Sequence, residues 1–187
     1  MRILAIPGSV RRDSHNARLL RYVAERAPAG VELELWDGLK SIPPYDEDDD
    51  TQFAPGPVAD LRDAIADADG LLFATPEYNG SVPGILKNAI DWASRPRATT
   101  PLQNKPAAVI GASTGAFGAV WAQQELRKVL RTAGARVVEA DLPLAKVHEA
   151  FDEFGNLQTE AHHAQIDKVL RALDAEVAAN RELAAVA

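Results

Sequence analysis

Short apolar runs alternate with longer amphipathic segments along almost the whole chain, and this alternation limits the possible folds more than any other feature. The apolar runs have the length of buried strands, and the segments between them carry apolar residues at helical spacing. Strands are predicted at residues 2–8, 31–36, 70–75, 105–113 and 136–144. Helices are predicted at residues 14–27, 58–68, 84–94, 119–134 and 159–184. Strands separated by helices predict a parallel sheet covered by helices on both faces.

Five parallel strands fit the flavodoxin-like order 2-1-3-4-5, an α/β fold with three layers. The chain has 187 residues, which is the length of one ordinary domain, so we expect residues 1–187 to form a single domain. Ligands of such sheets bind beyond the carboxyl ends of the strands, at the switch point between the first and third strands. The loops after the first, third and fourth predicted strands are therefore the expected sites of function.

Composition excludes several classes of function. The chain has no cysteine, which excludes disulfides, thiolate catalysis and zinc–thiolate sites. Its net charge of -7 argues against a general nucleic-acid or anionic-membrane binder. No apolar segment approaches the roughly 20 residues of a membrane span, so we expect a cytoplasmic protein without membrane contact. The acidic run 46–50 lacks the glycine and glutamate spacing of a calcium loop, so no metal site is predicted.

The first loop, GSVRRDSHN at residues 8–16, has the donors that a terminal phosphate needs. It lies before a predicted helix N-terminus, where backbone amides and the helix dipole favour an anion. Its hydroxyl, amide and guanidinium groups belong to Ser9, Arg11, Ser14 and Asn16. It is neither a P-loop nor a G-x-G-x-x-G dinucleotide fingerprint. The simpler alternative makes Ser14 a helix cap and the arginines solvated surface residues.

The second loop, PEYNGSVPG at residues 76–84, follows the third predicted strand. Its polar backbone suits the rim of a flat heteroaromatic ring, and Gly80 permits close approach because it has no Cβ. Asn79-Gly80 is a hairpin signal, but a helix follows instead of a strand, so we discount the hairpin. The alternative is a simple connection between strand and helix.

The third loop, GASTGAFG at residues 111–118, supports two interpretations. Its small residues place Ser113, Thr114 and the Gly115 amide at the same sheet edge as the other two loops. However, GASTG also matches the G-x-S-x-G nucleophile elbow of α/β hydrolases, and Asp141 and His148 follow in the order of that triad. A serine hydrolase is therefore an alternative from a different class.

Together, these three stretches resemble the NADPH-dependent FMN reductase family, which includes quinone, chromate and azo-dye reductases. The resemblance covers about residues 2–175, with the motifs in the same order. It implies that the first loop binds the FMN phosphate, the second wraps the isoalloxazine ring and the third lies at the ring's pyrimidine side. The implied contacts are Ser9, Arg11, Ser14 and Asn16; Pro76, Glu77, Tyr78, Asn79 and Gly80; and Ser113, Thr114 and Gly115. The chain departs from the family at Ala119, where members often have a second glycine.

The resemblance implies an FMN-dependent oxidoreductase that takes hydride from NADPH or NADH. The electrons pass through FMN to a small acceptor: a quinone, chromate, an azo compound or free flavin. Hydride transfer demands no general acid or base, so no catalytic side chain is predicted. Relatives are usually homodimers or homotetramers. A flavodoxin-type electron carrier is the second alternative, which the arginine in the phosphate loop disfavours.

Overall fold

The computed structural model describes residues 1–51 and 54–186, and its centre is one parallel sheet. The strands are β1 (Arg2–Pro7), β2 (Glu32–Leu35), β3 (Gly70–Thr75), β4 (Pro106–Ala112), β5 (Arg136–Val137) and β6 (Pro143–Leu144). The order β2-β1-β3-β4-β5 confirms the predicted flavodoxin-like topology. The carboxyl ends of β1, β3 and β4 therefore meet at one edge of the sheet.

The main helices also match their predictions to within a few residues. They are α1 (His15–Glu25), α2 (Gly56–Asp67), α3 (Gly84–Ala93), α4 (Val120–Thr132) and α6 (Glu160–Val186). The short helix α5 (Val147–Ala150) and the 3₁₀ turns η1 (Gly38–Ser41) and η2 (Glu47–Asp49) were not predicted. Helix α4 ends as expected, because Gly134 has a φ of 104° and the Ala135 N–H bonds the Leu130 carbonyl, the Schellman arrangement. Within the described residues, no helix is both long and apolar enough to cross a membrane.

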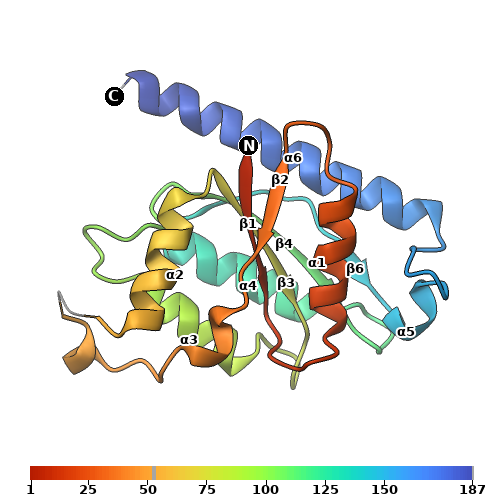
Figure 1. Cartoon of the computed structure of the whole chain (residues 1–187), viewed down its shortest axis with the longest axis horizontal. Helices are drawn as coiled ribbons and strands as arrows, with labels where there is room; N and C mark the ends of the chain where they lie inside the picture. Colours follow the sequence, from red (N-terminus) through yellow and green to blue (C-terminus); the bar gives the residue numbers. More distant parts are fainter. Residues whose placement is uncertain (52–53, 187) are drawn as a thin grey trace.

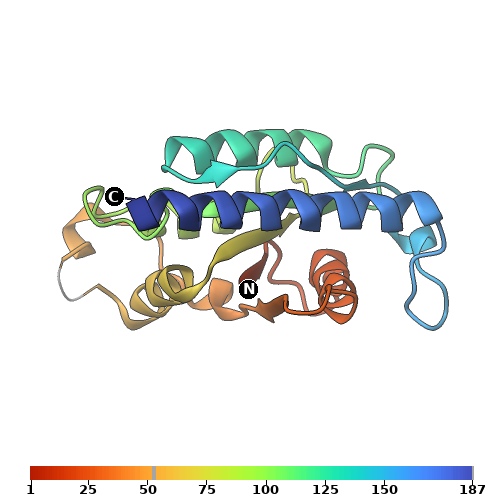
Figure 2. The same cartoon turned by 90° about the horizontal axis from the view of Figure 1, so that it is seen from above.

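Two apolar cores lie on opposite faces of the sheet, because successive strand residues point to opposite sides. Ile3 and Ala5 face the core that α1 and α6 cover, whereas Leu4 and Ile6 face the core under α2, α3 and α4. In Figure 1, α2 and α3 lie to the left of β1 and β3, and α1 lies to the right. Figure 2 shows α6 lying lengthwise across the molecule.

The last predicted strand, 136–144, is wrong as one continuous element. It is broken into β5 and β6, which pair with opposite ends of β4. Three residues of β4 separate Ala107 from Gly111, whereas five separate their partners Val137 and Pro143, so two extra residues bulge out between the two ladders. The buried Arg127 guanidinium of α4 fills the gap, donating to the carbonyls of Val109 (3.1 Å) and Ala140 (3.4 Å). A side chain thus takes the place of the missing backbone donors.

The long polar connection predicted at 37–57 is held against α3, and its residues 52–53 lie outside the described residues. The Asn88 side chain donates to the Pro43 carbonyl (2.8 Å) and accepts from the Tyr45 N–H (2.7 Å). The Trp92 indole N–H also donates to the Pro43 carbonyl, at 2.9 Å. The segment around Pro43 therefore follows the outer surface of α3.

Candidate functional site

The loops after β1, β3 and β4 meet around a cleft of about 290 Å³. In Figure 1, the loops that follow β1 and β3 lie side by side at the lower edge of the molecule. Nine of the twelve predicted site residues line the cleft: Ser9, Arg11, Ser14, Asn16, Pro76, Glu77, Tyr78, Ser113 and Thr114. Asn79, Gly80 and Gly115 belong to the same loops but lie outside its lining. Segments about a hundred residues apart in sequence thus form one site.

The start of α1 presents unused backbone donors to this cleft. The first four N–H groups of a helix have no partner within the helix. Here the Ser14 Oγ accepts from the Ala17 N–H at 3.2 Å, and the Ser14 carbonyl accepts from the Arg18 N–H at 3.0 Å. The N–H groups of His15 and Asn16 have no acceptor in the described part of the chain. Ser14 is therefore a helix cap, as the simpler alternative held, and it leaves two amides free for an anion.

Arg11 lines the same cleft as His15 and Asn16. It is exposed, and one of its amino groups donates to the Asp13 carbonyl at 2.5 Å, which curls the loop over itself. The Arg11 N–H donates to the Ser9 Oγ at 3.3 Å. Because a guanidinium has five donors, Arg11 retains capacity for an anion in the cleft.

Asn16 has a second role that the sequence did not reveal. Its side chain is buried, with Nδ2 donating to the Ala112 carbonyl and Oδ1 accepting from the Ala112 N–H, both at 2.9 Å. This amide joins the first loop to the third by pairing with the last residue of β4. Its backbone N–H, rather than its side chain, is the group left free for a ligand.

The second loop contains a tight turn at Asn79 and Gly80. Tyr78 and Ser81 exchange two backbone hydrogen bonds of 3.1 Å around Asn79 and Gly80. Both central residues have positive φ (56° and 74°), as a type I′ turn requires. No strand flanks this turn and α3 follows it, as expected, so a single bridging pair closes the turn without forming a strand hairpin. The turn exposes Tyr78, whose side chain is 53% accessible.

Glu77 connects the second loop to the third. Its Oε2 accepts from the N–H groups of Trp121 and Ala122, both at 3.1 Å, in the first turn of α4. Its carboxylate thus caps a helix whose own N-cap residue, Ala119, offers no capping side chain. Ser81 adds a second link through its hydroxyl, which donates to Glu125 of α4 at 2.5 Å.

The third loop is shaped by close backbone packing. The Gly115 N–H donates to the Ser113 Oγ at 3.1 Å, so the predicted Gly115 amide already has a protein partner. A Cβ at Gly118 would overlap the Pro143 backbone, and the φ of 57° there is left-handed. Ala119 is also left-handed, at 61°, which is uncommon for a residue other than glycine.

No hydrolase triad is assembled in the described residues. The Ser113 Oγ accepts from the Gly115 N–H, an Asp141 oxygen lies 4.0 Å from Arg127, and the His148 Nε2 lies 3.2 Å from Glu149. No hydrogen bond connects Ser113, Asp141 and His148 among these residues. The G-x-S-x-G match reflects the small residues of a close-packed loop.

His15, which was not among the predicted site residues, lines the cleft in the first turn of α1. Burial lowers the pKa of His15, and the charges of Arg11 and Arg18 and the nearby His148 lower it further. Its only sequence signal was its position between Ser14 and Asn16. The imidazole is therefore biased toward its neutral form beside the free amides.

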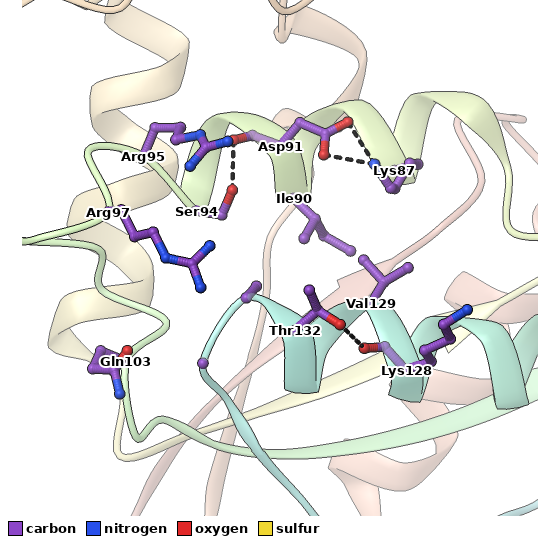
Figure 3. Close-up of a pocket in the computed structure, with 12 residues that line it drawn as sticks. Lys87, Ile90, Asp91, Ser94, Arg95, Arg97, Gln103, Lys128, Val129 and Thr132 are labelled. Atoms are coloured by element: carbon purple, nitrogen blue, oxygen red, sulfur yellow. Dashed lines mark hydrogen bonds and ion pairs between the residues drawn. The ribbon is translucent and has the colours of Figure 1, made fainter.

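A separate cavity of about 250 Å³ lies between α3 and α4, and none of the predicted site residues lines it. Figure 3 shows Lys87 paired with Asp91 at one end, and Arg97 extending toward Ser94 and Thr132 at the other. It lies by the carboxyl-terminal turns of both helices. This cavity is thus distinct from the three-loop cleft.

A flavodoxin-like sheet with a cleft at its switch point defines a class of nucleotide- and flavin-binding proteins. Within that class, residues 1–149 match the family model of NADPH-dependent FMN reductases. The chain therefore belongs to this family. The match confirms the predicted enzyme class, an oxidoreductase that uses FMN and NAD(P)H.

Individual relatives agree with the family. An NAD(P)H-dependent FMN reductase of Pseudomonas aeruginosa is 41% identical over 174 residues, covering 92% of this chain and 93% of that protein. A 2-hydroxy-1,4-benzoquinone reductase of a Burkholderia species is 46% identical over 129 residues, 69% of each chain. The solved flavoenzyme NAD(P)H:(acceptor) oxidoreductase FerB from Paracoccus denitrificans superposes with a TM-score of 0.80 at 34% identity, covering 97% of both chains.

Proposed function

We propose that the three-loop cleft binds FMN and that the enzyme passes electrons from NAD(P)H to small quinone-type acceptors. The observation that carries the site assignment is the pair of free N–H groups at His15 and Asn16 beside Arg11. Backbone amides at a helix N-terminus together with a guanidinium are the donor set that a terminal phosphate requires. The residues present therefore fit a phosphorylated cofactor.

FMN, when bound, would supply the redox chemistry, accepting hydride from NAD(P)H and passing electrons to the acceptor. The protein itself would bind the cofactor and orient its ring. The α1 amides, Arg11 and the hydroxyls of Ser9 and Ser14 would hold the phosphate. The Asn79-Gly80 turn would lie along the ring, since a Cβ at Gly80 has no neighbour within 4 Å and the backbone there is open. Ser113 and Thr114 would border the opposite side of the cleft.

Two observations support a quinone-type acceptor. The Burkholderia relative is named a 2-hydroxy-1,4-benzoquinone reductase, and a Pseudomonas putida relative is named a quinone reductase. Tyr78 is exposed at the rim of the cleft and offers a flat surface for an aromatic acceptor. Chromate, azo compounds and free flavin are further candidates because reduced flavin also gives electrons to them.

The test is spectroscopic. Purified protein incubated with FMN and then desalted should retain flavin absorbance, which NADPH or NADH should bleach without oxygen and a benzoquinone should restore. Failure to retain or bind FMN would overturn the proposal. Retained flavin that NAD(P)H reduces poorly would instead indicate an electron carrier.

We also propose that the protein is a homodimer or homotetramer, as the family resemblance implies. Phe117 and Trp121 support this, since both are exposed (62% and 47%) with ring centroids 4.9 Å apart, leaving an apolar surface next to the cleft. Light scattering during size-exclusion chromatography tests it, and a monomer at micromolar concentration would exclude it. A cytoplasmic location is likewise a proposal, and cell fractionation tests it.

A further inference from the structure

A second cavity, of about 220 Å³, adjoins the three-loop cleft. The two share Ser9 and Arg11, so the phosphate loop forms the wall between them. The second cavity lies by the carboxyl ends of β1 and β2, between the first half of α1 and the turn η1. It is therefore at the same sheet edge as the cleft, next to the end that would hold the flavin phosphate.

This cavity is strongly cationic in an acidic protein. Arg11, Arg12, Arg21 and Lys40 line it, with Asp37 as the only carboxylate in the lining. In the residues that the structure describes, the side chains of Arg12, Arg21 and Lys40 have no hydrogen-bond or ion-pair partner, and all three are exposed. If Arg11 serves the flavin phosphate, the others leave a net charge of about +2. A phosphomonoester carries about −1.5 to −2 at pH 7, which matches that excess.

The same cavity has an apolar wall made by Trp36, Leu39 and Val10. Trp36 is half-buried, and its ring lies directly over Gly38, where a Cβ would come within 2.5 Å of the indole. The indole N–H has no acceptor within the described part of the chain. An indole edge and aliphatic side chains beside a cluster of cations suit a ligand with a flat heterocycle and a phosphate.

We propose that this cavity binds the adenosine 2′-phosphate end of NADPH and makes NADPH, rather than NADH, the preferred reductant. The inference rests on the proposed function, because the nicotinamide end has to reach a flavin in the adjoining cleft. Lys40 and Arg21 are the specificity-determining cations, since both lie outside the loop that would hold FMN. Trp36 and the exposed Val10 would pack against the adenine.

The cavity between α3 and α4 has a similar charge but a different environment. Its Lys87 is neutralised by Asp91 at 2.6 Å, and the cavity lies by the carboxyl-terminal turns of two helices (Figure 3). The carbonyl end of a helix favours cations, which accounts for Arg95 and Arg97 just after α3 without any ligand, and Lys128 is an exposed residue of α4. It also shares no lining residue with the cleft, whereas the cavity beside α1 shares Ser9 and Arg11 with it.

Isothermal titration calorimetry with 2′-phospho-ADP-ribose and ADP-ribose tests the proposal directly. The wild-type protein should bind the 2′-phosphorylated compound about tenfold or more tightly, the scale of one or two charged hydrogen bonds. Its kcat/KM should favour NADPH over NADH by a similar factor. Lys40→Glu and Arg21→Glu should each lower both ratios toward one, whereas Lys128→Glu, the same charge change in the α3–α4 cavity, should retain the wild-type ratios.

The outcomes separate this inference from the proposed function. Equal binding of the two compounds by the wild-type protein would overturn it, as would a 2′-phosphate preference that survives both charge reversals or is lost equally in Lys128→Glu. The calorimetry measures binding of the two compounds to the cavity whether or not flavin is present. A protein that binds no FMN would therefore contradict the proposed function alone. Flavin content and Tm, measured on every variant, identify any change that is merely a loss of fold.

Discussion

The side-chain amide of Asn16 and the backbone of Ala112 are joined by two hydrogen bonds of 2.9 Å, although 96 residues separate them. Both residues are only 2% exposed. The pair ties the start of α1 to the end of β4, so two of the three cleft loops are held at a fixed spacing. A cleft made of loops needs such a link, because loops are otherwise the most mobile parts of a fold.

Asn16→Ala should therefore lower the free energy of unfolding by about 2–4 kcal/mol, because it leaves a buried N–H and a buried carbonyl unpaired. Urea denaturation measures the change. Asn180→Ala in α6, where the side chain makes no bond to the described residues, should shift stability by less than about 0.5 kcal/mol. Equal stability of the Asn16 and Asn180 variants would show that the bridge contributes nothing.

Glu77→Ala should destabilise the protein by about 1–2 kcal/mol, since Trp121 and Ala122 would lose the acceptor of two N–H groups at the start of α4. Glu77→Gln keeps an acceptor oxygen but loses the charge that complements the helix dipole, so it should lose about half as much. Thermal and urea denaturation of the pair measure both effects. Were the two variants equally stable, the charge would have no part in the cap.

Residue types and loop positions predicted where the cleft would lie, but not the bonds within it. The motif placed Asn16 and Glu77 in the right loops because a parallel sheet brings the ends of β1, β3 and β4 together. Their partners, Ala112 and the α4 amides, are set by how those loops pack in three dimensions. A local sequence pattern contains no information about a partner that far away. His15 was missed for the same reason, since only the fold shows that it faces the cleft.

Arg11→Ala should weaken FMN binding by roughly 1.5–3 kcal/mol, the scale of a hydrogen bond to a charged group. Fluorescence quenching of free FMN during titration measures the affinity. Arg171→Ala on the exposed face of α6 removes the same charge far from the cleft and should leave the affinity unchanged. If both variants bind FMN as the wild type does, Arg11 does not contact the phosphate.

Gly118→Ala should cost more than about 2 kcal/mol, because the left-handed backbone penalises a Cβ and the new methyl group would overlap Pro143. Gly84→Ala is the matched control. A Cβ there, at the first residue of α3, meets no atom within 4 Å and should stabilise by about 0.4–1 kcal/mol. Differential scanning calorimetry should give Tm shifts of opposite sign, and a tolerated Gly118→Ala would contradict the packing described for the third loop.

Stability should fall as pH drops through and below about 6.5, the ordinary histidine value. Burial lowers the pKa of both His15 and His162, so the unfolded chain binds protons at a higher pH than the folded chain does. Under proton linkage, this imbalance makes the free energy of unfolding rise with pH across that window and fall on acidification. Urea denaturation at about pH 7.5 and 5.5 should show the loss, and His15→Gln with His162→Gln should reduce it. A double variant with the wild-type pH profile would contradict this origin.

The fold was predictable because five apolar runs and five helical patterns agree with one topology. The break between β5 and β6 was not, because the run 136–144 is apolar enough for one strand. What divides it is Arg127, a helix residue whose guanidinium reaches the Val109 and Ala140 carbonyls. That a charged side chain would be buried there becomes visible only when α4 is packed on the sheet. Whether residues 1–187 unfold as one domain stays a prediction that a single cooperative transition would support.

The hydrogen bonds from Asn88 and Trp92 to the backbone of Pro43 and Tyr45 determine which mutations this segment can tolerate. Two of these bonds end on the Pro43 carbonyl oxygen and the third comes from the Tyr45 N–H. They therefore depend on the path of the main chain rather than on which side chains it carries at positions 43 and 45. The acidic stretch just beyond can vary in composition as long as that path is kept, except at Asp50, whose carboxylate accepts from Arg62 at 2.8 Å. Insertions or deletions between β2 and Tyr45 would instead pull the segment around Pro43 away from α3, and that helix would lose its outer support.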